Sequence, residues 1–144
     1  MFDELIEKLK HCDGVNYEIG ENFIRVFASA PKGFPVMIEW VWDTHFTVSL
    51  DGWRQDFDTY QEAVRCFALA VSGRFRLKTR SKGGFRFRWT VEYWDGSSWV
   101  EDTTTTDLLY PFWKPTTTNY LRNDLRCGDT TDVSRPAWNL AAAS

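Results

Sequence analysis

Residues 74–93 alternate between polar and apolar side chains almost without interruption, and this alternation restricts the fold more than any other feature of the chain. Successive side chains of a β-strand point to opposite faces, so a period of two indicates strands. Two such segments, FRLKTR at 75–80 and FRFRWTVEY at 85–93, flank a glycine-containing turn at 82–84. The pattern therefore predicts an antiparallel hairpin with one apolar face and one cationic face.

The cationic face of this hairpin raises the question of what compensates its charge. A three-residue turn at 82–84 would place Lys78 directly across from Arg88, and like charges so placed destabilise a sheet by roughly a few tenths of a kcal/mol or more. We therefore expect an anionic group to cover the cations predicted to share this face, which are Arg74, Arg76, Lys78, Arg80, Arg86 and Arg88.

The covering group is either part of the chain or part of a partner. Removing the seven positive charges of residues 74–89 from the net charge of −3 leaves −10 for the rest of the chain, so internal acids are available. The acids considered for this role are Asp51, Asp56, Asp58, Glu101 and Asp102. The alternative is an external polyanion, which is a nucleic-acid backbone, a phosphate-bearing ligand or an acidic protein patch.

Two other segments have the period of an amphipathic helix, FDELIEKLKHC at 2–12 and YQEAVRCFALAVS at 60–72. Their apolar residues recur at a spacing of three and four, which places them on one side of a helix. The second segment follows Asp58 and Thr59, which favour a helix N-terminus, and Gly73 favours its end. We expect both helices to pack against a sheet.

Further strand patterns complete the predicted fold. They lie at NFIRVFA, VMIEWVW, FTVSL, WRQDF and SWVED, in addition to the two segments of the hairpin. The order α-β-β-β-α-β-β-β predicts an α+β fold, with a strongly twisted antiparallel sheet of about six strands and two amphipathic helices on one face. A partly closed barrel is the alternative.

Two more turns are predicted from the requirement that apolar residues lie across from apolar residues in a hairpin. In residues 36–50, a three-residue turn at 43–45 would pair Trp42 with Phe46 and put His45 in the left-handed conformation. An Asp-Gly turn at 95–96 would place Val100 across from Val91. The strands between residues 74 and 102 would then form one meander.

The C-terminal third lacks clear periodicity. From about Thr103 onward, threonine runs and prolines predict an irregular segment that wraps the domain, with a short helix at 118–126. We expect one domain at 1–126 and a flexible arm at 127–144.

No motif in the chain predicts a catalytic, cofactor or metal site. The cysteines, at positions 12, 66 and 127, are widely spaced and are expected to be buried thiols, and His11 and His45 lie far apart in the sequence. No apolar run reaches the roughly 20 residues of a membrane span, and no basic and apolar leader begins the chain, so a cytoplasmic protein is expected.

The best-supported function is therefore a non-enzymatic interaction module that binds a protein partner or a second copy of itself. Eight tryptophans are many for a small domain, and Trp94, Trp99 and Trp113 are expected to form an exposed aromatic surface. The first alternative is a nucleic-acid binder that uses the six cations on phosphates. The second is a small enzyme with an aromatic pocket near Glu101, Asp102 and Asp107.

Overall fold

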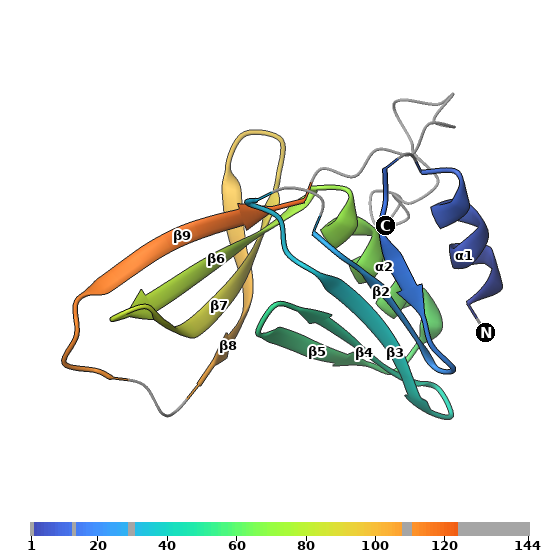
Figure 1. Ribbon diagram of the computed structural model, residues 1–144, viewed down its shortest axis with the longest axis horizontal. Helices are drawn as coiled ribbons and strands as arrows, with labels where there is room; N and C mark the ends of the chain where they lie inside the picture. The colour runs from blue at the N-terminus through green and yellow to red at the C-terminus, as the bar shows by residue number, and fades with distance from the viewer. Residues whose placement is uncertain (1, 13, 29–30, 108–110, 124–144) are drawn as a thin grey trace.

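The computed structural model of the chain describes residues 2–12, 14–28, 31–107 and 111–123. Within these ranges the chain forms two helices and two antiparallel sheets (Figure 1). The helices are α1 (Asp3–Lys10) and α2 (Tyr60–Val71). The strands are β1 (Tyr17–Ile19), β2 (Phe23–Val26), β3 (Val36–Trp42), β4 (His45–Leu50), β5 (Trp53–Phe57), β6 (Phe75–Lys82), β7 (Phe85–Trp94), β8 (Trp99–Thr106) and β9 (Thr116–Arg122).

The sheet organisation differs from the single sheet of about six strands that the sequence predicts. Sheet 1 contains β1 to β5 in sequence order, and sheet 2 has the order β8-β7-β6-β9. Helix α2 joins β5 to β6, so the chain leaves the first sheet before it begins the second. Sheet 2 extends away from the body formed by sheet 1 and the helices (Figure 1). The α+β class with antiparallel sheets and two helices is confirmed.

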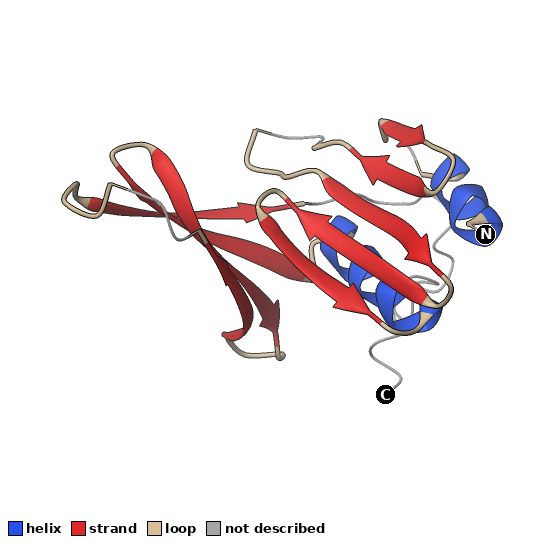
Figure 2. Cartoon of the chain, turned by 90° about the horizontal axis from the view of Figure 1, so that it is seen from below, coloured by secondary structure: helices blue, strands red, loops and turns tan. Residues whose placement is uncertain are grey.

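Both predicted helices are present, and both cover the same face of sheet 1 (Figure 2). The Thr59 side chain accepts a hydrogen bond from the backbone N–H of Glu62, which satisfies a donor in the first turn of α2. The ring of Phe2, at the start of α1, contacts the rings of Phe46 in β4 and Tyr60 in α2. The apolar faces of the helices thus meet the inward-facing side chains of sheet 1.

One hydrophobic core joins the two sheets. Sheet 1 and α2 contribute the largest fully buried side chains, among them Trp53 and Phe67. One face of sheet 2, the inner face, adds Leu77, Val91 and Leu121 to the same cluster. Burying these side chains contributes roughly 1.5–3 kcal/mol for each large apolar residue.

The turn between β4 and β5 attaches sheet 1 to sheet 2. The indole Nε1 of Trp89 in β7 donates to Asp51 Oδ2 at 2.8 Å, and the indole Nε1 of Trp53 donates to Thr103 Oγ1 in β8 at 3.1 Å. Gly52 lies directly against the Trp89 ring, since a Cβ at this position would come within 2.2 Å of the indole. A side chain would therefore push the two sheets apart.

The turn between β3 and β4 is one residue shorter than predicted, but apolar residues of the two strands still pair with each other. A two-residue turn pairs Trp42 with His45, and a β-bulge then sets Trp40 opposite Phe46. The predicted pairing of Trp42 with Phe46 is therefore wrong, and Asp43, with φ of 48°, takes the left-handed conformation expected of His45. The bulge restores the pairing of apolar with apolar residues, because it inserts one extra residue in one strand.

The predicted meander of β6, β7 and β8 is confirmed, although its last turn is longer than expected. Val100 pairs with Tyr93 instead of Val91, and four residues, 95–98, connect the strands. The carboxylate of Asp95 accepts hydrogen bonds from the backbone N–H groups of Ser97 and Ser98, which lower the pKa of its carboxyl group. This side-chain interaction stabilises the longer loop.

The prediction for the C-terminal third is wrong within the described residues. Strand β8 continues to Thr106, and residues 116–122 form strand β9 where the start of a helix was expected. Leu121 of β9 pairs with Leu77 of β6, so core packing decides the conformation of this segment. The predicted arm at 127–144 lies outside the described residues.

The cysteines also differ in part from the expectation of buried thiols. Cys66 on α2 is a buried free thiol, and burial raises its pKa to about 12, with a further contribution from Asp102. Cys12 is disulfide-bonded, so the expectation is wrong for this residue. Cys127 lies outside the described residues. Neither helix within those residues has the length and hydrophobicity that a membrane-spanning helix requires.

Candidate functional site

The charged side chains of sheet 2 gather on the face opposite the core, which we call the outer face. Residues paired across neighbouring strands share a face, so the strand register arranges this surface in rows that run across β8, β7, β6 and β9. From the α2 end of β6 toward the β6–β7 turn, the rows are Glu101-Glu92-Arg76-Arg122, Thr104-Thr90-Lys78-Tyr120 and Thr106-Arg88-Arg80-Thr118.

The row nearest α2 is charge-balanced, with two acids beside two arginines. The guanidinium group of Arg76 forms an ion pair with the buried carboxylate of Glu92. The same group lies between two rings, 4.5 Å from the centroid of Trp99 and 4.2 Å from that of Tyr120. Arg122 lies 5.0 Å from the Trp99 centroid. These contacts fix the position of Arg76, and its charge is compensated within the chain.

Lys78, in the middle row, is also compensated. Its Nζ lies 3.2 Å from Glu101 Oε1, in the neighbouring row. Glu101 is one of the acids expected to neutralise the cationic strip, and this part of the prediction is confirmed. The predicted partner across the hairpin is wrong, because Lys78 pairs with Thr90 and not with Arg88.

The third row, which we call the arginine row, has no acidic member. Arg80 of β6 lies directly opposite Arg88 of β7, with Thr118 and Thr106 on either side. Neither arginine forms an ion pair with any residue that the structure describes, and the enclosed Nε–H groups of both have no acceptor there. The one ring contact recorded for them places Arg88 at 5.9 Å from the Phe87 centroid. Two like charges thus face each other without a compensating acid among the described residues.

A β-bulge separates Arg86 from the other cations. The register shifts between Arg80 and Ser81, so Arg88 pairs with Arg80 while Arg86 pairs with Ser81 on the inner face. Arg86 Nη1 donates to Asp51 Oδ2 at 2.7 Å, beside the indole of Trp89. The prediction that all six cations share one face is therefore wrong.

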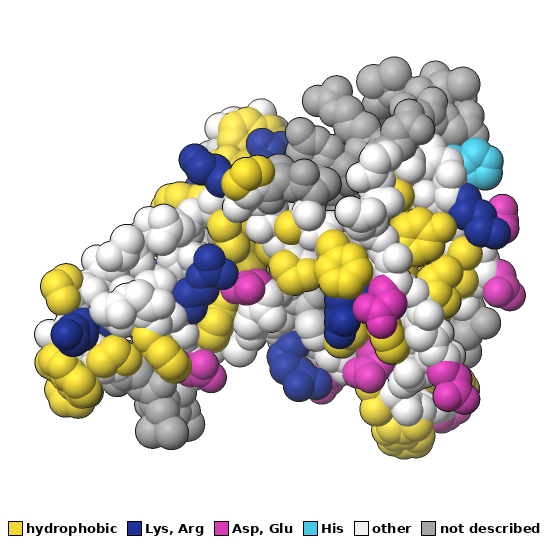
Figure 3. Space-filling model, in the orientation of Figure 1, with side chains coloured by type: hydrophobic (Ala, Val, Ile, Leu, Met, Phe, Trp, Pro, Cys, Tyr) yellow, Lys and Arg dark blue, Asp and Glu magenta, His cyan; other side chains and the backbone are white. Residues whose placement is uncertain are grey.

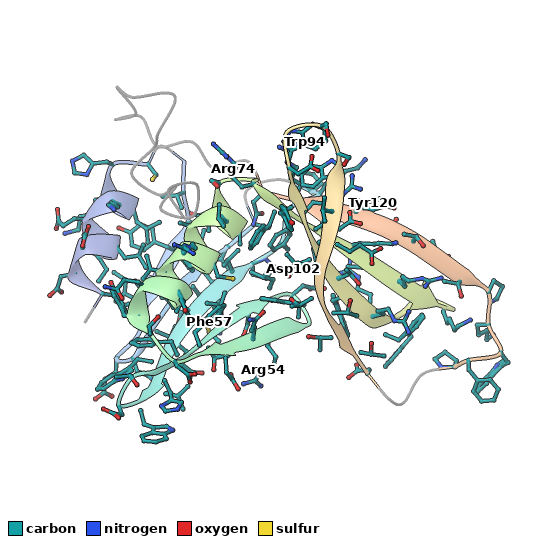
Figure 4. All side chains as sticks on the ribbon, turned by 180° about the vertical axis from the view of Figure 1, so that it is seen from behind. Arg54, Phe57, Arg74, Trp94, Asp102 and Tyr120 are labelled. Atoms are coloured by element: carbon teal, nitrogen blue, oxygen red, sulfur yellow. The ribbon has the colours of Figure 1, made fainter. Side chains whose placement is uncertain are left out.

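Arg74, the remaining predicted cation, precedes β6 and is exposed near the end of α2 (Figure 4). Alternation continues only within a strand, so the register does not assign it to the outer face. Four of the six predicted cations are thus on the outer face, and two of these four are uncompensated within the described residues. Their role as binding residues stays a prediction.

Exposed aromatic side chains gather at the tip of sheet 2 beyond the arginine row. Phe112 and Trp113 are 71% and 69% exposed, and Phe85, which pairs with Lys82, is 47% exposed. Lys82 Nζ donates to the backbone carbonyl of Lys114 at 3.2 Å, which brings the two loops of the tip together. Figure 3 shows hydrophobic side chains at this end of the molecule, at the far left.

The three tryptophans predicted to form one aromatic surface lie at two ends of sheet 2. Trp94 and Trp99 are in contact at the end of the β7–β8 hairpin, with ring centroids 5.5 Å apart. Figure 4 shows Trp94 and Tyr120 toward this end. Trp113 lies near the opposite end of β7, which at roughly 3.3 Å per residue is about 30 Å away. A single partner surface would have to span the whole sheet to touch all three.

Among the described residues, His45 Nε2 lies 3.7 Å from Asp58 Oδ1, while the acids considered for an enzymatic site do not converge. Glu101 lies on the outer face beside Lys78, whereas Asp102 influences the thiol of Cys66 on α2, so adjacent acids point to different sides of β8. His45 stacks on Trp42 with centroids 4.3 Å apart, at the tip of the β3–β4 hairpin. No group of three or more metal-ligating residues is present in the described part of the chain.

Sequence reasoning missed the contribution of β9 to the outer face. Thr118, Tyr120 and Arg122 complete the three rows, and Tyr120 forms half of the ring pair around Arg76. The alternation of these residues with Leu121, in a segment rich in β-branched side chains, was a signal for a strand.

Comparison of the chain with protein-family models, with curated proteins and with solved structures finds no significant match. The role of the outer face is therefore inferred from its geometry and charge.

Proposed function

We propose that the protein is a non-enzymatic interaction module that binds an acidic partner protein through the outer face and the aromatic tip of sheet 2. The arginine row carries this proposal, because two opposed guanidinium groups lack an acidic partner among the described residues. An acidic side chain of a partner would remove their repulsion and form charge-assisted hydrogen bonds.

The aromatic tip supports a protein as the partner. Phe112 and Trp113 are the most exposed large hydrophobic residues in the described part of the chain, and they lie at the same end of sheet 2 as the arginine row. Arginine and aromatic residues are the residue types enriched in the energetic centres of protein interfaces. The surface combines both types.

A nucleic-acid partner has weaker support. Arg76 and Lys78 are paired with acids, and Arg86 lies on the inner face with Asp51, so the basic strip is interrupted. A phosphate backbone needs several uncompensated cations along its path, and the chain carries a net charge of −3. The remaining cations suit a small acidic patch better than an extended polyanion.

The proposal can be tested with defined polymers on the purified full chain. A random copolymer of glutamate and tyrosine supplies acidic and aromatic groups, and single-stranded and duplex oligonucleotides supply phosphates. We expect the copolymer to bind, the double variant Arg80→Gln/Arg88→Gln to weaken binding by roughly tenfold or more, and Phe112→Ala/Trp113→Ala to weaken it as well. The readout is fluorescence anisotropy of the labelled polymer at low and physiological salt.

Trp42→Ala provides the matched control, because Trp42 is 60% exposed but lies at the tip of the β3–β4 hairpin. This variant should bind the copolymer as the wild-type protein does. Failure of the copolymer to bind, or binding that the Arg80/Arg88 variant leaves unchanged, would contradict the proposal. Tighter, steeply salt-dependent binding of the oligonucleotides would establish the nucleic-acid alternative instead.

A further inference from the structure

We infer that Arg80 and Arg88 form a binding site for a doubly charged phosphate group carried by a phosphorylated side chain. The inference rests on the proposed function in one respect: the phosphate is carried by the partner protein that this function requires. The site itself rests on the arginine row, in which four residues from four strands lie in register on one face. Neighbouring strands are roughly 4.8 Å apart, so both guanidinium groups can contact one tetrahedral anion.

The charge of the pair matches a phosphomonoester. Two guanidinium groups carry two positive charges, and a phosphorylated serine, threonine or tyrosine carries about −1.5 to −2 at pH 7. A carboxylate or a phosphodiester carries only one negative charge and would leave the pair half compensated. Arginine also presents paired N–H donors that fit phosphate oxygens.

Competing acids on the same face are already engaged. Glu92 contacts Arg76, and Glu101 contacts Lys78, both in the direction of α2. Lys82, which follows Arg80 toward the tip, keeps its charge while it donates to a backbone carbonyl. Among the described residues, no side-chain carboxylate therefore has to be displaced from Arg80 or Arg88 by an incoming anion.

The polar groups around the pair are arranged to receive an anion. The Nε atoms of both guanidinium groups are enclosed without an acceptor among the described residues. Thr106 and Thr118 flank the pair, are exposed, and carry hydroxyl groups that can donate to further phosphate oxygens. An anion in front of the row would thus meet donors from all four strands.

The test compares three versions of one labelled glycine-serine peptide with a single central residue, which is phosphoserine, serine or glutamate. We expect the phosphoserine peptide to bind the full-length protein roughly tenfold tighter than either of the others, because only its charge matches the pair. Arg80→Gln and Arg88→Gln should each remove this preference. Arg86→Gln is the matched control and should keep it, because Arg86 lies on the inner face.

A second measurement separates the phosphate site from its proposed source. Inorganic phosphate should raise the melting temperature of the wild-type protein above that in chloride of equal ionic strength, and this increase should vanish in Arg80→Gln/Arg88→Gln. Thermal unfolding also verifies that the variants fold.

The outcomes distinguish this inference from the proposed function. Equal binding of the phosphoserine and glutamate peptides would overturn the inference while the acidic-partner proposal stands. Stabilisation by inorganic phosphate without a preference for the phosphoserine peptide would overturn the assignment to a phosphorylated side chain. A phosphoserine preference without any binding of the glutamate-tyrosine copolymer would support the inference and contradict the broader proposal. Selective binding of an oligonucleotide over the phosphoserine peptide would also overturn the inference of a site for a phosphorylated side chain.

Discussion

Arg76 shows how one residue on the outer face serves the fold instead of a partner. Its guanidinium group compensates the buried carboxylate of Glu92 and packs between the rings of Trp99 and Tyr120. Removing it leaves a buried charge without a partner and opens the space between β8 and β9. Arg80, four residues further along the same strand and on the same face, has no such contacts among the described residues. Position within the rows therefore separates structural cations from candidate binding cations.

We predict that Arg76→Leu lowers the free energy of unfolding by about 2–3 kcal/mol, because it leaves the Glu92 carboxylate buried and unpaired. The double variant Arg76→Leu/Glu92→Leu should recover part of this loss, since both charges are then absent. Urea denaturation measures both values. Arg74, an exposed arginine before β6, provides the control. If Arg76→Leu lowers the free energy of unfolding no more than Arg74→Leu does, the structural role of Arg76 is contradicted.

Ionisation of the buried Cys66 thiol is expected to lower the stability of the protein in alkaline solution. Burial, with a contribution from Asp102, raises the pKa of its thiol from 9.0 to about 12, so the folded protein keeps a proton that the unfolded chain releases. Between these two values the unfolded state binds fewer protons than the folded state, and the free energy of unfolding falls as pH rises, by up to about 1.4 kcal/mol per pH unit. Below the unfolded-state pKa this contribution is fully present.

The alkaline loss of stability should be smaller in Cys66→Ala than in the wild-type protein. Denaturation at a series of pH values from neutral to alkaline measures the difference between the two slopes. The wild-type thiol should also react slowly with a thiol reagent in native buffer and rapidly in denaturant, because it is buried. Parallel slopes for the two proteins would show that the thiol does not cause the change.

At the scale of elements, turns and bulges decide which side chains share a face. In β6 and β7 one bulge moves Arg86 to the inner face and sets Arg80 against Arg88. In β3 and β4 a two-residue turn alone would pair apolar with polar residues, and another bulge restores the pairing of apolar with apolar residues. Both hairpins alternate in sequence, but the bulge in the first divides its cations between two faces. The bulge in the second keeps its apolar residues on one face.

In the β4–β5 turn, Gly52 lies directly against the Trp89 indole of β7. We predict that Gly52→Ala destabilises the protein by about 1–3 kcal/mol, because the added methyl group overlaps the Trp89 indole and the backbone must move. Thermal unfolding provides the measurement. The penalty should shrink in a Trp89→Leu background, where the indole is gone. An equal penalty in both backgrounds would show that the clash is not its cause.

At the scale of the whole molecule, the two sheets depend on one another. The inner face of sheet 2 belongs to the same hydrophobic cluster as sheet 1 and both helices. Polar contacts also cross from the β4–β5 segment to β7 and β8, through Asp51, Trp53, Arg54 and Gln55. The inner face of sheet 2 therefore holds this sheet to the body.

Because the sheets share one core, we predict a single cooperative unfolding transition. Circular dichroism and tryptophan fluorescence should give the same midpoint in urea. A fragment of residues 74–144 should not fold alone, because Leu77, Val91 and Leu121 would lose the side chains that cover them. A dispersed NMR spectrum of that fragment, or two separate transitions in the whole protein, would contradict this view.

Local patterns in the sequence determined the two helices, most strands, the β6–β7–β8 meander and the separation of an apolar from a largely cationic face. These features follow from side-chain periodicity and capping, which act over a few residues. The prediction that Arg76, Lys78, Arg80 and Arg88 share one face of the hairpin is confirmed, because alternation within each strand depends on that strand alone.

Only the tertiary structure decided the division into two sheets, the strand at 116–122 and the compensation of individual cations. Strand β9 forms because Leu121 pairs with Leu77, some forty residues earlier in the chain. Likewise, Asp51 and Glu92 select Arg86 and Arg76 as partners through strand register and a bulge. Such contacts between distant residues depend on how whole elements pack, and periodicity within one segment carries no information about them.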